Sequence, residues 1–152
     1  MKQEYGASLI EIVGVLAIAG LMSGAAIGMY NVIRNNQARK IASVEMQEIA
    51  RDAKLLMEMR GDYTGISVDY LVEQGALANN HAPIGGDNWS VTATSDGQAF
   101  SINLTDLSQG ECQYFAATPP QWAARVIVNG FETDISDNCF TTNTNQLSFV
   151  VE

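Results

Sequence analysis

The sequence lacks the residue combinations on which most catalytic and metal sites depend. Its only histidine, His81, lies in a loop rich in asparagine, proline and glycine, where a solvated imidazole is favoured over a metal ligand. No nucleophile elbow, Walker loop or His-Glu-x-x-His motif occurs in the sequence. These absences predict a protein that is not an enzyme and needs no cofactor. The alternative, a membrane-anchored enzyme, has no residue constellation to support it.

Basic residues are nearly missing from the second part of the chain. Residues 61–152 hold Arg125 alone against eleven acidic residues, a net charge of −10, whereas residues 34–60 hold six basic and four acidic residues. This balance excludes sequence-specific nucleic-acid binding by the acidic part and disfavours its contact with an anionic membrane surface. Any DNA contact would have to use the basic neck at Arg34 to Lys40.

Charge is absent from Ile12 to Ile33, a run of 22 residues of which 16 are hydrophobic. As a helix this run is about 33 Å long, which matches the thickness of a bilayer. A secretory signal peptide would have a shorter apolar region followed by a small-residue cleavage site. The sequence therefore predicts one membrane-length segment joined to a soluble acidic head. It excludes a cytosolic globule, a polytopic transporter and a disordered chain.

Proline is absent before Pro83, so nothing interrupts a helix in the first part of the chain. After the apolar run, hydrophobic residues recur at steps of three and four, which indicates an amphipathic continuation of the same helix. This stripe consists of Ala42, Met46, Ile49, Ala53 and Leu56. We expect one helix over about Ala7–Arg60, roughly 80 Å long, that ends at Gly61-Asp62 and packs its second half on a sheet.

Alternating patterns and turn signals predict an antiparallel sheet in the head, and therefore an α+β fold. The expected elements are a short helix at 68–74, a hairpin of 89–93 with 100–104, a helix at 108–117, a second hairpin of Arg125–Val128 with Phe131–Ile135 around Asn129-Gly130, and a last strand at 147–151.

The two cysteines, Cys112 and Cys139, both lie in the acidic head. An even count in a domain outside the cytoplasm favours a disulfide, with two unpaired thiols as the alternative. The closed loop of about 28 residues would contribute roughly 3.6 kcal/mol to stability on the loop-entropy model.

Three residues of the same region, Asp134, Asp137 and Asn138, offer oxygen atoms of the kind that bind Ca²⁺. Their spacing does not match an EF-hand, and a solvated acidic turn is favoured over a calcium site.

A single carboxylate stands at the start of the apolar run, in the segment Gly6-Ala7-Ser8-Leu9-Ile10-Glu11. An ionised acid costs roughly 2.5–3.5 kcal/mol at the centre of a membrane span, so such a residue is by default functional. This segment resembles the leader junction of type IV pilins and related pseudopilins. The alternative is a signal anchor in which Glu11 only lies at the level of the lipid headgroups.

The resemblance implies that a prepilin peptidase cuts between Gly6 and Ala7 and N-methylates Ala7. It also implies that inner-membrane assembly machinery builds the chain into a helical, homo-oligomeric filament, and that Glu11 is needed for this step. The new ammonium of an incoming subunit can pair with Glu11 of its neighbour. That pair neutralises two ions that would each be costly alone in an apolar fibre core, and it fixes the axial register.

Gly20, Gly24 and Gly28 form two overlapping Gly-x-x-x-Gly steps on one face of the expected helix. Small residues at this spacing let helices approach closely in a bilayer, which predicts a packing face for neighbouring pilin helices. The alternative is a generic membrane anchor that tolerates glycine.

The head carries a looser resemblance to type IVb and conjugative thin-pilus major pilins. It rests on Tyr63-Thr64-Gly65-Ile66, on Gly85-Gly86-Asp87-Asn88-Trp89-Ser90-Val91, and on Cys112 and Arg125-Val-Ile-Val-Asn-Gly130 through Cys139. The implied organisation is a leader (1–6), a transmembrane and polymerisation helix (7–33), the amphipathic half of that helix (34–60) and a globular pilin head (61–152). The implied function is a structural subunit of a type IV pilus. The alternative is a minor pilin or type II secretion pseudopilin that acts as a tip or binding module.

Two arguments about topology disagree. Lys2 precedes the apolar run, whereas Arg34, Arg39 and Lys40 follow it, and this count would place the neck in the cytoplasm. The resemblance implies the opposite: a precursor in the bacterial inner membrane with its head in the periplasm, and an extracellular pilus after assembly. The cysteine pair suits an oxidising compartment and favours this second topology.

Overall fold

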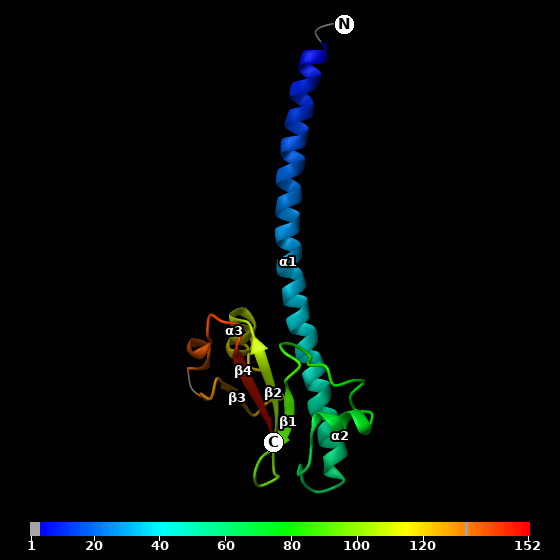
Figure 1. Ribbon diagram of the computed structural model, residues 1–152, viewed down its shortest axis with the longest axis vertical. Coiled ribbons are helices and arrows are strands. Elements are labelled where there is room, and N and C mark those ends of the chain that lie inside the picture. The colour runs from blue at the N-terminus through cyan, green and yellow to red at the C-terminus, as the bar shows by residue number, and fades with distance from the viewer. Residues whose placement is uncertain (1–3, 133) are drawn as a thin grey trace. The chain divides into compact units, whose positions relative to one another are not determined.

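The computed structural model describes residues 4–132 and 134–152, which divide into two compact units at Ala38 and Arg39. The first unit is the beginning of helix α1 (Glu4–Glu58). The second unit holds the rest of α1 and the elements labelled in Figure 1: α2 (Val68–Glu73), β1 (Ser90–Ala93), β2 (Phe100–Leu107), α3 (Gln109–Ala117), β3 (Arg125–Val128), the 3-10 helix η1 (Ile135–Asn138) and β4 (Asn145–Val151). The predicted α+β fold is confirmed.

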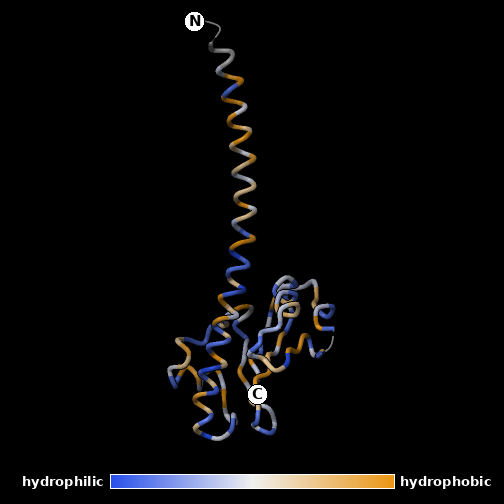
Figure 2. The backbone as a smooth tube through the Cα atoms, turned by 180° about the vertical axis from the view of Figure 1, so that it is seen from behind, coloured by the Kyte–Doolittle hydropathy of each residue, from blue (hydrophilic) through white to orange (hydrophobic). Residues whose placement is uncertain are grey.

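The first unit is a single helix in which none of the described side chains is buried. α1 begins and ends within three residues of the predicted bounds, and every side chain from Ser8 to Ala38 is exposed. Figure 2 shows mostly apolar colours along this part of the chain. A helix that is apolar on all sides has to be covered by lipid or by other chains. By length and composition, α1 is the one helix among the described residues that is able to cross a membrane.

The second part of α1 buries the predicted apolar stripe against the sheet. The stripe is confirmed, although Leu56 is only partly covered, and two further residues widen it. Positions 46, 50, 53 and 57 share one helix face, so a face in contact with a sheet is wider than a single line of residues. The buried side chains are those of Ala42, Met46, Ile49, Ala50, Ala53 and Met57.

The described strands form one antiparallel sheet in the order β1-β2-β4-β3. The first predicted hairpin is confirmed, because β1 pairs with β2 and places Val91 opposite Ile102. In the next pair, β2 with β4, Ile102 lies opposite Phe149. These three side chains share one face of the sheet and are buried in the same core as α1. On the other face, the hydroxyls of Thr92 and Ser101 form a hydrogen bond of 3.1 Å.

The segment after α1 is fastened to the turn between β1 and β2. The backbone N–H of Tyr63 donates to the carbonyl of Gly97 at 2.9 Å. Burial, and then the nearby Glu58 carboxylate, raise the pKa of the Tyr63 hydroxyl. In the turn, the Thr94 hydroxyl and the Gln98 N–H donate to the carboxylate of Asp96, and these hydrogen bonds lower its pKa. The first shift follows from burial at this junction, and the second follows from the hydrogen bonds of the turn.

The second predicted hairpin is wrong in its return strand. The Asn129-Gly130 turn forms, with backbone hydrogen bonds of 2.9 Å in both directions between Val128 and Phe131. Pairing ends there, and β3 instead pairs along its length with β4. β4 has the matching alternation, whereas the chain after Phe131 forms η1 and leads to Cys139, which is bonded to Cys112 on α3. Disulfide closure and a distant strand therefore replace the local pairing.

α3 carries the buried end of this disulfide. The predicted helix at 108–117 is confirmed, and Ser108 caps it in a reciprocal capping box with Glu111. Cys112 is fully buried, and its Cα atom is 5.9 Å from that of Cys139. The disulfide is therefore formed, and the alternative of two unpaired thiols is wrong.

A bulge near the end of β2 explains a glycine pair in the head. Asp106, within the bulge, has a φ of 54°. The backbone N–H of Gly86 donates to the Thr105 carbonyl at 2.8 Å. A Cβ atom on Gly85 would collide with that carbonyl oxygen, and one on Gly86 would collide with the Asp106 carboxylate. These close contacts within the fold explain why glycine occupies positions 85 and 86.

Replacing Gly85 by alanine is expected to cost about 3 kcal/mol of unfolding free energy, against about 1 kcal/mol for Gly75→Ala. Both glycines have positive φ values, 85° and 76°. A Cβ atom meets open space at Gly75 but a main-chain oxygen at Gly85, so the control isolates the collision. Urea unfolding of the two variants measures the difference in unfolding free energy. Equal unfolding midpoints would show that the backbone at the β2 bulge moves aside without a loss of stability.

Candidate functional site

Glu11 is an exposed carboxylate in the apolar part of α1. Its neighbours Ile10 and Ile12 are 76% and 52% exposed. Within the part of the chain that the structure describes, no cation forms an ion pair with Glu11. A carboxylate in this position needs a counter-ion once the helix leaves water, because an unpaired charge is costly in an apolar medium.

No described part of the chain packs closely against Gly20, Gly24 or Gly28. A Cβ atom on any of them would meet nothing within 4 Å. Each costs about 1 kcal/mol of helix stability relative to alanine, and small residues at this spacing allow a neighbouring helix to approach closely. Their role as a packing face stays a prediction. Ser23, beside this face, donates its hydroxyl to the Ala19 carbonyl at 2.7 Å, which satisfies the hydroxyl within the helix.

Glu11 and Gly20 point in opposite directions. Nine positions separate them, which is two and a half helical turns. Gly24 and Gly28 lie about 140° and about 100° around the helix from Glu11. A group that contacts Glu11 would therefore lie on a different side of α1 from a helix that packs on the three glycines.

Gly6 and Ala7 belong to the first turns of α1, but their side chains lie outside the described part, as do residues 1–3 of the expected leader. Cleavage between Gly6 and Ala7 and methylation of Ala7 stay predictions.

The loop closed by the disulfide is organised by an asparagine that the sequence analysis missed. Asn145 is fully buried, and its side-chain amide donates to the carbonyls of Leu107, Phe140 and Thr142 at 3.0–3.1 Å. Its oxygen accepts from the Phe140 N–H and from the Asn129 amide, at 2.6 and 3.0 Å. These bonds tie the chain after Cys139 to the ends of β2 and β3. Its one distinguishing feature in the sequence is its position after a run of polar residues. Such a run is typical of an exposed loop and gives no sign of a buried side chain.

His81 and the acidic turn are the two places where the sequence offers metal-binding atoms. His81 is exposed, with its Nδ1 atom 3.5 Å from an Asp87 oxygen. Asp134 and Asp137 are exposed at η1, where the Asp137 N–H donates to the Asp134 carbonyl at 3.0 Å. No group of three or more potential metal ligands occurs among the described residues.

No protein-family model and no curated protein matches the sequence. Among solved structures, the crystal structure of TcpA, a type IV pilin from Vibrio cholerae El Tor biotype, is similar. The TM-score is 0.60, and the match covers 76% of this chain and 99% of that chain. The two sequences are 14% identical, so the likeness is one of fold. About three quarters of this chain thus has a fold that is similar to that of a type IV pilin.

Proposed function

We propose that this chain is a structural subunit of a type IV pilus, held in the bacterial inner membrane and polymerised through α1 into a surface fibre. The observation that carries the proposal is the combination of a helix with every side chain exposed from Ser8 to Ala38 and a fold shared with a type IV pilin. Such a helix needs apolar surroundings, which the bilayer supplies before assembly and the fibre core supplies afterwards.

In this proposal a prepilin peptidase removes residues 1–6 and methylates Ala7. The new ammonium lies about one helical turn from Glu11 of its own chain. As a subunit enters the fibre, that ammonium pairs with Glu11 of a neighbour, and the pairing distance sets the axial position of each subunit. Methylation retains the positive charge, so the pair stays neutral overall.

Different faces of α1 then contact different neighbours. The Glu11 side engages one chain, and the Gly20, Gly24 and Gly28 side packs on another. Contacts between unlike surfaces generate a ring when the rotation between subunits closes and an open helical assembly when it does not. The proposed fibre is the second of these cases.

The head residues support a surface pilus of the type IVb or conjugative thin-pilus kind. The segments 63–66 and 85–91 and the loop closed by Cys112 and Cys139 carry that resemblance. Such a fibre would serve adhesion, aggregation, motility or mating contact, with the acidic heads facing water.

Electron microscopy of sheared surface fibres, combined with mass spectrometry of their main subunit, tests the proposal. We expect this chain to be the bulk component and to begin at methylated Ala7. Fibres in which the chain is scarce would instead indicate a minor pilin or a secretion pseudopilin at the tip. A chain that retains residues 1–6 and never leaves the membrane would contradict the proposal.

A further inference from the structure

Cations are few in the second unit, and the arginines have partners within it. These partners are Asp52 for Arg51, Glu132 for Arg125, and the rings of Tyr114 and Tyr70 for Arg39 and Arg60. Among the described residues from Arg39 onward, Lys40 and Lys54 have neither an ion pair nor an aromatic contact. Lys54 is half-buried, so part of its stem is already ordered while its ammonium lacks a counter-ion.

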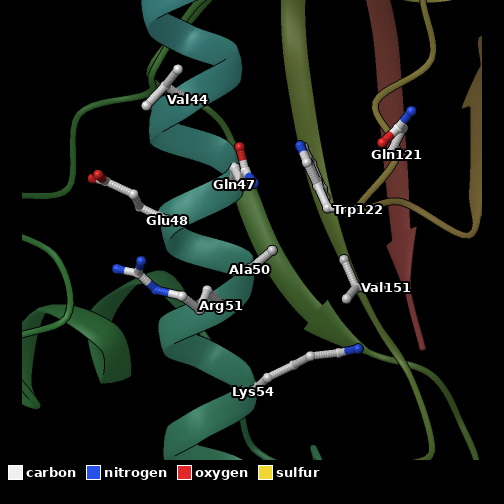
Figure 3. Close-up of a pocket in the computed structure, with 9 residues that line it drawn as sticks. All are labelled: Val44, Gln47, Glu48, Ala50, Arg51, Lys54, Gln121, Trp122 and Val151. Carbon is white, nitrogen blue, oxygen red and sulfur yellow. The ribbon is translucent and has the colours of Figure 1, made fainter.

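Lys54 lies in an open groove of about 570 Å³ on one flank of α1 (Figure 3). Figure 3 shows its side chain extending from α1 toward the side of Val151. Trp122 forms part of the far wall and is held by Phe149, with ring centroids 5.5 Å apart. We name this the basic groove; its lining residues are Val44, Gln47, Glu48, Ala50, Arg51, Lys54, Gln121, Trp122 and Val151.

The other flank of α1 carries the opposite charge. A second open groove, of about 430 Å³, is lined by Glu45, Glu48 and Asp52 of α1 together with residues of the loop 75–83, and by no lysine or arginine. We name these three carboxylates the acidic flank. Glu48 borders both grooves, so the ridge of α1 separates a region of negative charge from one with an excess of positive charge.

We infer that the basic groove binds the acidic flank of a second copy of this chain, with Lys54 against Glu45, Glu48 or Asp52 of that copy. The inference rests on the proposed function and identifies a contact between the second units of neighbouring chains in the fibre. Because the chain has a net charge of −9, close-packed copies repel one another unless opposite charges meet locally. Lys54 is the cation best placed to do this, because it is unpaired and lies in a groove with an apolar wall.

A second copy fits this groove better than an extended polyanion does. Residues 61–152 have a net charge of −10, which repels a nucleic acid or an acidic polysaccharide along most of its length. A second copy needs opposite charge only where it contacts the groove, and each repeat of the fibre supplies one such contact. The basic groove and the acidic flank are unlike surfaces of one chain, so their contact is compatible with the repeated addition of subunits along a fibre. Val44, 55% exposed at the edge of the basic groove, would be covered in the same contact.

Carbodiimide cross-linking of sheared fibres tests the contact, because this reagent joins an amine to a carboxylate only where they touch. We expect a dimer band that contains a Lys54 linkage to Glu45, Glu48 or Asp52 and a monomer band that lacks it. The matched control is Lys54→Arg, which keeps the charge but does not react. It should form normal amounts of fibre and lose the linkage. Fibres of this chain whose dimer band lacks that linkage would overturn the inference and leave the proposed function intact.

Charge reversal supplies a second test. Lys54→Glu is expected to reduce the fibre yield about tenfold, since it places like charges in contact. Adding Glu45→Lys, Glu48→Lys or Asp52→Lys should restore the yield for the carboxylate that contacts Lys54. Lys40→Glu changes the net charge equally but lies outside both grooves, so its yield should stay near wild type. Equal losses from Lys40→Glu and Lys54→Glu, or no restoration by any of the three charge reversals on the acidic flank, would refute the specific contact. Absence of this chain from wild-type fibres would instead refute the proposed function.

Discussion

Surface fibres are expected to disappear when Glu11 is replaced by alanine, while the amount of the chain in the membrane stays unchanged. In the proposed function, insertion depends on the apolar run that follows, which the substitution leaves intact. Assembly, in the same proposal, depends on a partner for the ammonium that enters the apolar fibre core. Leaving one member of a buried ion pair alone costs about 3–5 kcal/mol, which corresponds to a loss of fibre of about 100-fold or more.

Two further substitutions separate charge from size at this position. Glu11→Gln keeps the length of the side chain and removes its charge, so it should lose fibres as alanine does. Glu11→Asp keeps the charge on a shorter side chain, so it should retain part of the yield. Immunoblots of membranes and of sheared fibres measure both quantities, with mass spectrometry to verify removal of residues 1–6. Normal fibres from the alanine variant would contradict the pairing of Glu11 with a neighbouring amino terminus.

The elements that depend on local pattern were predictable from the sequence. α1 follows from the missing proline and the period of its apolar residues, and the β1–β2 hairpin follows from alternation on both sides of a short turn. The Asn129-Gly130 turn was equally predictable, because its signal is local. The return strand expected after the turn does not form, because β4, which lies further along the chain, pairs with β3 in its place. Pairing between distant segments leaves no trace in a local pattern.

Asn145 and Lys54 were harder to identify from the sequence than Glu11. Asn145 follows four polar residues and looks exposed, yet it is fully buried and has five hydrogen bonds. Lys54 looks like an ordinary polar residue of an amphipathic helix. Its lack of a partner emerges only when the contacts of the arginines are known. Glu11 was accessible to sequence reasoning because a charge beside an apolar run is informative without any structure.

Removing the disulfide is expected to lower the unfolding free energy of the head by about 3.6 kcal/mol. The variant Cys112→Ser/Cys139→Ser should therefore melt about 15 °C below the wild type. Its folded structure should change little, because Asn145 and Asn129 still hold the chain after residue 139 to the ends of β2 and β3. The loss arises in the unfolded state, which becomes less compact once the loop of about 28 residues is opened.

This origin predicts a specific pattern in urea unfolding of the full chain in detergent. The double serine variant should have a lower midpoint and a steeper dependence on urea, because its unfolded state exposes more surface. A reducing agent should produce the same changes in the wild type and none in the variant, which controls for the serine substitutions. If the midpoint falls while the slope stays constant and circular dichroism of the folded state changes, the disulfide instead stabilises native packing around α3. Under that outcome Asn145 would not hold the loop without the sulfur bridge.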